Sequence, residues 1–207
     1  METLTTTAHA GMHRDDTASK LGMWLFIFTE ILLFGGMFIV YSVYRFKNPV
    51  AFGLAHEELS IPMGFINTII LLISSATVAI SISAMQKNDK KLTMIMLGVT
   101  LLLALIFLVN KYFEWGAKFE HGMYPGSELM SFLSNGDKLF FGLYFFMTGL
   151  HGVHIIIGMI LLLITLFKVK KGTVNKGQYA LLENSGLYWH LVDLIWIFLF
   201  PLFYLIH

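Results

Sequence analysis

The sequence of 207 residues contains no cysteine and few charged residues. Without cysteine, the chain has no disulfide, no thiolate zinc site, no iron–sulfur cluster and no covalently attached c-type haem. Charged residues make up 13% of the sequence and the net charge is +1, whereas an average soluble domain is about 25% charged. The chain therefore has no basic surface for nucleic acid and too few charges to cover a soluble globule. This composition excludes a soluble enzyme, a nucleic-acid-binding protein and a disordered chain.

Other features are absent as well. The sequence has no glycine-rich phosphate-binding loop, which argues against ATP-driven transport by this chain alone. It has no internal repeat of the kind that builds inverted-repeat transporters. The first residues, METLTTTAHAGMHRDDTASK, lack the apolar segment of a cleavable signal peptide. We therefore expect a polar cytoplasmic tail over residues 1–19 and one membrane domain over residues 20–207.

Hydrophobic residues account for 57% of the chain and gather in five long runs. A helix needs about 20 apolar residues to cross roughly 30 Å of hydrocarbon, whereas a β-barrel strand crosses with about 10 that alternate with polar residues. Each run suits a helix and none suits a strand. The sequence predicts an all-α membrane protein, a bundle of five transmembrane helices at about residues 21–44, 61–85, 92–115, 139–167 and 187–206.

Lysine and arginine residues near the helix ends predict the orientation, because positively charged loops stay on the cytoplasmic side. With the N-terminus inside, nine of these residues lie in inner segments and five in outer ones. We therefore expect an inside N-terminus and an outside C-terminus. The inner residues are Arg14, Lys20, Lys87, Lys90, Lys91, Lys168, Lys170, Lys171 and Lys176, and the outer ones are Arg45, Lys47, Lys111, Lys118 and Lys138.

Glu30 is the clearest polar residue within an apolar run. It lies nine residues past Leu21, about 13 Å into the helix at about 1.5 Å per residue. A charged side chain at that depth costs at least about 3 kcal/mol, and Lys20 and Arg45 are too distant along the helix to pair with it. We expect a neutral carboxyl that donates to a lipid head group, a water, Asn67 or His190. Both a proton-handling role and a purely structural role remain open.

Further polar residues form stripes on three predicted helices. His151 and His154 lie three residues apart and hence on one helix face. A second polar stripe lies around the start of the last predicted helix. A third polar stripe, on the second predicted helix, repeats every seven residues. Small residues beside the histidines are expected to admit a neighbouring helix. The members of these sets are Glu183, His190 and Asp193; Asn67, Ser74 and Ser81; and Gly149, Gly152 and Gly158.

The histidines raise the alternative of a haem or metal site. Two histidines three residues apart on one helix cannot bind opposite faces of one haem. A bis-histidine haem would need His190 together with His151 or His154, and Asp193 crowds that pair. Hydrogen bonds between helices, worth about 1 kcal/mol or less each, are the favoured interpretation. A b-type haem membrane anchor is the less favoured one.

Five segments, in order along successive predicted helices, resemble subunit III of the haem–copper terminal oxidases, the cytochrome c and quinol oxidases. The first carries an intramembrane glutamate at Glu30, and the fourth resembles the family's paired-histidine signature. The segments are WLFIFTEILLFGGMF (Trp24–Phe38), NTIILLISSATVAIS (Asn67–Ser81), YFEW (Tyr112–Trp115), TGLHGVHIIIG (Thr148–Gly158) and YWHLVDLIWIFLF (Tyr188–Phe200). The resemblance implies a non-catalytic subunit in the inner (plasma) membrane of a bacterium.

Several further expectations follow from the resemblance alone. It implies that the chain packs on oxidase subunit I, with subunit II and a small subunit IV as further partners. It implies that haem and copper lie in those partners, with no cofactor or metal in this chain. It implies phospholipids in a cleft and support of proton uptake, oxygen reduction and proton translocation. The lipid-binding or proton-linked residues would be Glu30, His151, His154, Glu183, His190 and Asp193, none of them catalytic.

The chain departs from many members of this family, which have seven helices, because it lacks the first two. Whatever those helices contribute is then absent or supplied by a partner. The YWHLVD and YFEW segments favour a cytochrome c oxidase. A quinol oxidase subunit and an accessory subunit of nitric oxide reductase remain alternatives.

Overall fold

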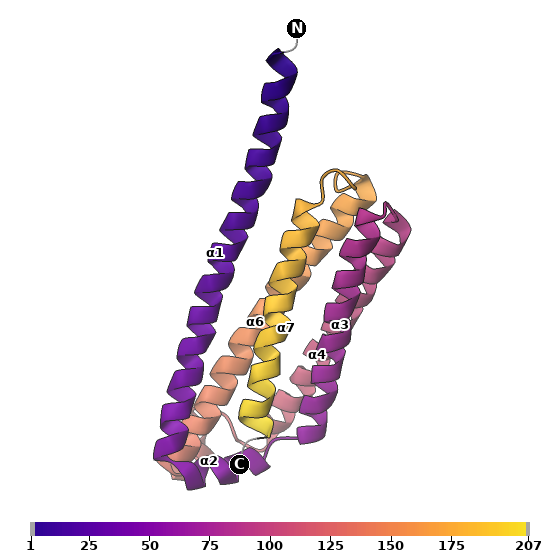
Figure 1. The fold of residues 1–207 in the computed structure, drawn as a ribbon. Helices are drawn as coiled ribbons and strands as arrows, with labels where there is room; N and C mark the ends of the chain where they lie inside the picture. The colour runs from indigo at the N-terminus through magenta and orange to yellow at the C-terminus, as the bar shows by residue number, and fades with distance from the viewer. Residues whose placement is uncertain (1–2, 206–207) are drawn as a thin grey trace.

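The computed structural model describes residues 3–205, with side chains described for residues 17–130 and 132–205. This part of the chain contains helices and no β-strand. The helices are α1 (Thr3–Lys47), α2 (Pro49–Glu57), α3 (Ile61–Gln86), α4 (Lys90–Glu120), α5 (Glu128–Phe132), α6 (Asn135–Lys171) and α7 (Ala180–Tyr204) (Figure 1). Five of them, α1, α3, α4, α6 and α7, are long and apolar enough to cross a membrane. The predicted fold class, an all-α membrane protein with five spanning helices, is confirmed.

Most helices extend beyond the apolar runs that predicted them, because hydrogen bonds and turns set their ends while hydrophobicity marks only the membrane-spanning part. The Asp89 side chain accepts from the backbone N–H of Leu92, so α4 starts before its apolar run. Ser134 and Asp137 form a capping box that starts α6. Residues 3–19, predicted as a polar tail, continue α1, since adding residues to an existing helix costs little. Residues 1 and 2 lie outside the described residues.

Helix α7 is the central element of the bundle. It packs between α3 and α6, while α4 joins α3 to α6 and α1 packs on α6 and α7. In its most apolar stretch 61% of the residues are buried, compared with 17% in α1. Helix α1 therefore lies at the edge of the bundle, as Figure 1 shows. Of the polar stripe of α7, Asp193 is buried, whereas Glu183 and His190 are partly exposed.

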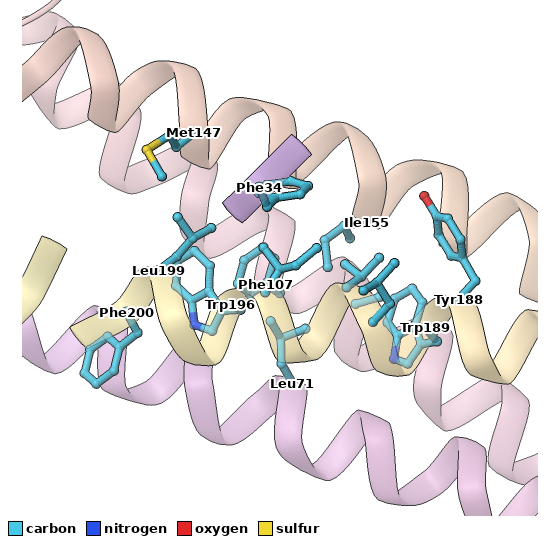
Figure 2. Close-up of a cluster of buried hydrophobic side chains, with 14 of the residues drawn as sticks. Phe34, Leu71, Phe107, Met147, Ile155, Tyr188, Trp189, Trp196, Leu199 and Phe200 are labelled. Carbon is cyan, nitrogen blue, oxygen red and sulfur yellow. The ribbon is translucent and has the colours of Figure 1, made fainter. Parts of the chain in front are cut away.

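Large aromatic side chains fill the space around α7. Figure 2 shows Trp189 and Trp196 of α7 packed among residues of the other spanning helices, including Phe34 and Phe107. Both tryptophans also donate hydrogen bonds to α3, Trp189 to Ser74 Oγ at 3.1 Å and Trp196 to Thr68 Oγ1 at 3.0 Å. The core is thus mainly apolar, and two hydrogen bonds from its tryptophans hold α7 to α3.

The three glycines predicted to admit a neighbour behave differently from one another. A Cβ atom on Gly158 would lie 2.8 Å from Cε3 of Trp189, so the close approach of α7 there is confirmed. One on Gly149 would lie 3.0 Å from the Trp115 ring, whereas one on Gly152 would meet nothing within 4 Å. Among the described residues of this chain no neighbour fills the space beside Gly152, contrary to the prediction for that position.

Two short helices cover one end of the bundle. Helix α2 begins with Pro49 after the break at Asn48 and packs on α6 through Phe52 and other apolar residues. Helix α5 lies in the connection between α4 and α6. Figure 1 shows α2 beside the C-terminus, and we call this the C-terminal end of the bundle; the α3–α4 turn and the α6–α7 connection lie at the opposite, N-terminal end. Several lysines lie in the α3–α4 turn and the α6–α7 connection at that N-terminal end.

The N-terminal end of the bundle is predicted to face the cytoplasm. Because the chain has no cysteine, single cysteines are clean probes, and Thr173 and Glu120 are exposed residues at opposite ends. In intact cells, a membrane-impermeant maleimide should label Glu120→Cys and leave Thr173→Cys unlabelled until the membrane is permeabilised. The reverse pattern would invert the orientation.

Candidate functional site

Glu30 on α1 and His154 on α6 form a direct pair, with Glu30 Oε2 3.0 Å from His154 Nε2. Both side chains are nearly buried, at 13% and 9% exposure. The expected partners, Asn67 and His190, were wrong. Asn67 lies on α3, on which α1 packs little, and it accepts from Asn110 Nδ2 of α4 at 2.9 Å. His190 lies on α7 but faces Ser75 of α3.

The second nitrogen of His154 decides what this pair can do. His154 Nδ1 lies 2.8 Å from the carbonyl oxygen of Leu150, which can only accept, so Nδ1 carries a proton. If His154 is neutral, Nε2 is an acceptor and Glu30 is the protonated donor. If His154 is charged, Nε2 donates to an ionised Glu30. In both forms one proton lies between the two side chains.

Aromatic residues enclose the pair. The Phe34 ring stands edge-on to His154, with centroids 5.3 Å apart. The Tyr188 hydroxyl donates to the carbonyl oxygen of His154 at 3.2 Å. The first contact packs against the imidazole and the second holds the backbone of α6, and together they tie α1, α6 and α7 at one level of the bundle.

The polar stripe of α7 divides between two neighbouring helices. Glu183 forms an ion pair with Lys20 of α1 at 2.8 Å, and His190 Nδ1 lies 2.6 Å from Ser75 Oγ of α3. Both residues line a cavity of about 310 Å³, together with Lys20, Trp24, Ile82 and Leu187. Asp193 does not line it. The Asp193 carboxylate is buried and faces Ser75, without a well-formed hydrogen bond to any described side chain.

His151 is fully buried and held by rings instead of hydrogen bonds. The ring stacks on Trp196 at 5.2 Å and meets Phe107 edge-on at 5.7 Å. Neither ring nitrogen has a hydrogen-bond partner among the described residues. His151, His154 and His190 are therefore held by three different sets of neighbours. In the described part of the chain no group of three or more His, Asp or Glu side chains is arranged to hold a metal ion.

A buried polar cluster near the C-terminal end was missed by the sequence analysis. Its members are Lys111 and Glu114 of α4, Tyr144 of α6 and Tyr204 of α7, all nearly inaccessible. Lys111 Nζ lies 3.1 Å from Glu114 Oε2, 3.2 Å from the Tyr144 hydroxyl and 3.0 Å from the Tyr204 hydroxyl. The Tyr144 hydroxyl donates to Glu114 Oε1 at 2.6 Å, and the Tyr204 hydroxyl donates to the same oxygen.

Aromatic rings complete the surroundings of the Lys111 ammonium group. It lies 5.1 Å from the ring centre of Trp196, 5.2 Å from that of Tyr144 and 5.7 Å from that of Tyr204, within the range of cation–π attraction. The cluster thus supplies the buried charges with counter-charge, hydrogen bonds and ring faces. It fastens the end of α7 to α4 and α6.

Two lysines counted among the outer charges are buried inside the bundle. Lys111 belongs to the buried cluster, and Lys118 is buried and donates to the carbonyl oxygen of Glu58. The spacing of Lys111 and Glu114, three residues apart on one helix face, was a signal available in the sequence. Removing both lysines from the outer count strengthens the predicted orientation.

Comparison with known proteins gives a consistent result. The profile described as cytochrome c oxidase subunit III matches residues 2–207. A protein of Staphylococcus saprophyticus named "Probable quinol oxidase subunit 3" is 32% identical over 190 residues, covering 91% of this chain and 89% of that protein. Proteins of the same name from Staphylococcus haemolyticus and Staphylococcus aureus strain USA300 are 32% and 31% identical, each with the same coverage.

Removing one member of the Lys111–Glu114 pair should be worse than removing both. Lys111→Met or Glu114→Gln alone leaves a buried partner uncompensated, a loss of about 3–5 kcal/mol in typical buried pairs. The double variant should lose less stability than either single one, measured as the unfolding midpoint of the purified protein in detergent. Tyr112→Met, at a 76% exposed position on the same helix, is the control. Additive losses would contradict the pairing.

Proposed function

The chain belongs to the cytochrome c oxidase subunit III family, and we propose that it is the non-catalytic third subunit of a haem–copper quinol oxidase. As a member of that family it is a multi-pass membrane protein of an oxidoreductase complex and associates with oxidase subunit I. Subunit III of this family carries no redox cofactor. The family match extends over residues 2–207, and the observation that supports a quinol oxidase is the name of the relatives that cover 91% of the chain.

The electron donor is the point on which the sequence segments and the relatives differ. The YWHLVD and YFEW segments favoured cytochrome c. The relatives that cover 91% of the chain are named as quinol oxidase subunits, and this supports quinol as the donor of the complex. The donor binds to partner subunits in either case, so the contribution of this chain does not change with it.

The Glu30–His154 pair is proposed as the proton-linked group of this subunit. It lies well inside the bundle, holds one proton between two side chains and joins the edge helix α1 to α6. Such a pair can buffer a proton beside subunit I without being an obligatory step in oxygen reduction. His151 and Asp193 are proposed as buried residues of the same interior, which shape the surroundings of the pair.

The cavity beside Lys20, Glu183 and His190 is the proposed phospholipid site. The half-exposed ammonium group of Lys20 and the imidazole of His190 would contact the lipid head group at the membrane interface. Trp24 and Leu187 would contact the acyl chain of the lipid. A phosphate group would replace Glu183 as the partner of Lys20. We further propose that subunit II and a small subunit IV complete the complex and that a partner covers the exposed side of α1.

The donor can be tested on the complex purified through a tag on this chain. The complex should reduce oxygen with a quinol as electron donor and remain inactive with reduced cytochrome c. Its second subunit should lack a copper-binding cysteine pair. Rapid oxidation of cytochrome c by the same preparation would restore the alternative, a cytochrome c oxidase.

Glu30 variants test the auxiliary role. Glu30→Gln keeps a hydrogen-bonding group beside His154, so the complex should assemble and turn over at nearly the normal rate. Glu30→Lys places a second basic group against His154 in a buried position, so less of the subunit should co-purify with subunit I. Glu57→Gln, at an exposed position at the end of α2, is the control and should change little. Complete loss of oxygen reduction in Glu30→Gln with full haem content would make the carboxyl an obligatory proton carrier.

A further inference from the structure

Three side chains connect the cavity beside Lys20 to the interior of the bundle. His190 of α7 lines that cavity and is partly exposed. His190 Nδ1 lies 2.6 Å from Ser75 Oγ of α3, and the same serine faces the carboxyl group of Asp193. Because His190 and Asp193 lie three residues apart on one face of α7, a single serine of the neighbouring helix reaches both. We call these three residues the α3–α7 row.

The α3–α7 row leads from the membrane interface toward the bilayer centre. Beside His190, Lys20 and Glu183 form an ion pair at 2.8 Å, with side chains 50% and 23% exposed. Asp193 lies ten residues past Glu183, about 15 Å along α7 at about 1.5 Å per residue, which is half of roughly 30 Å of hydrocarbon. Asp193 itself is 3% exposed. The row therefore joins an accessible imidazole to a deeply buried carboxyl group.

The residue types of the row suit the transfer of a proton. A neutral imidazole donates with one nitrogen and accepts with the other, and a serine hydroxyl both donates and accepts. When a proton binds to His190 Nε2, Nδ1 gives its own proton to Ser75 Oγ, and Ser75 gives its hydroxyl proton to the Asp193 carboxylate. The imidazole and the hydroxyl are then neutral again, and Asp193 is a carboxylic acid. Release of the proton follows the same steps in reverse.

We propose that the α3–α7 row is a proton relay through which the buried carboxyl group of Asp193 exchanges protons with the aqueous phase at the N-terminal end of the bundle. At rest the proton lies on Asp193, because a buried carboxylate that faces no cation is costly. Ser75 is the residue that makes the relay, since it is the group between His190 and Asp193. This assigns a transfer role to a serine that the sequence did not single out.

The ionisable groups around the row are engaged elsewhere. Helix α7 packs on α1, α3 and α6. On α1, Lys20 pairs with Glu183 and Glu30 pairs with His154 of α6. His151 of α6 is held between the rings of Phe107 and Trp196. Helix α3 contains no Asp, Glu, Lys, Arg or His. The relay is therefore separate from the Glu30–His154 pair and shares no residue with it.

A hydrogen bond that only holds α7 to α3 would place Ser75 and His190 in the same way. The neighbouring Ser74 makes such a bond, because its Oγ accepts from Trp189 Nε1 at 3.1 Å. Ser74 and Ser75 thus each bind a side chain of α7, but only Ser75 lies between two groups that gain and lose protons. The two serines are a matched pair for separating fastening from transfer.

Hydrogen–deuterium exchange at Asp193, followed by infrared spectroscopy of the purified full-length protein in detergent, tests the relay. The carboxylic acid C=O band that Asp193→Asn removes identifies the group, and this band shifts when deuterium replaces the acid proton. Ser75→Ala should slow the shift by at least about 100-fold, the usual scale for losing a group that transfers a proton. Ser75→Thr keeps the hydroxyl and should exchange at the normal rate. Ser74→Ala is the matched control and should also exchange at the normal rate.

Three results would overturn the proposal. An unchanged exchange rate in Ser75→Ala would show that the proton takes another route, and equal slowing in Ser74→Ala would assign the effect to fastening. A spectrum without an acid band due to Asp193 would show that the carboxyl group does not hold the proton. Should Ser75→Ala fail to fold, His190→Gln replaces it, because an amide hydrogen-bonds to Ser75 but has no second ring nitrogen, so exchange should again be slow. Oxygen reduction is not measured, so the proposed function is tested independently.

Discussion

A polar group inside the bilayer that finds no partner within the protein is costly, because hydrocarbon offers no hydrogen bonds. This constraint explains why α7 is central. Its polar residues would be costly at the edge of the bundle, and from the centre they reach Ser75 of α3, Lys111 and Glu114 of α4 and the backbone of α6. The tryptophans of α7 follow the same rule, since each places a ring in the core and its N–H on a hydroxyl of α3.

The fold could be predicted because its determinants are local. Run length alone distinguishes a spanning helix from a strand. The small residues beside the histidine pair predicted a close neighbour, which at Gly158 is α7. The side chains that pair with one another across helices could not be predicted, because the pairing depends on which helices are in contact. Glu30 pairs with His154 and not with Asn67, since α1 packs on α6 and α7 and makes little contact with α3.

The buried cluster shows a second limit of sequence reasoning. Lys111 was counted among the outer charges at a helix end because a lysine near the end of an apolar run is usually at the interface. The helix continues to Glu120 instead, and the lysine turns inward to Glu114 and two tyrosines. Tyr144 and Tyr204 gave no signal, since tyrosine suits both core and interface. Their role depends on two hydroxyl groups, 60 residues apart in the chain, meeting one carboxylate.

The pairing of Glu30 with His154 also constrains how the protein is made. The two residues are 124 positions apart in the chain, and ribosomes add about 5–20 residues per second, so the histidine follows the glutamate by about 6–25 s. During that interval α1 has reached the membrane before α6 and α7, on which it packs, have been synthesised. Until the second half of the subunit is made, the Glu30 carboxyl therefore lies in the first helix without its histidine partner.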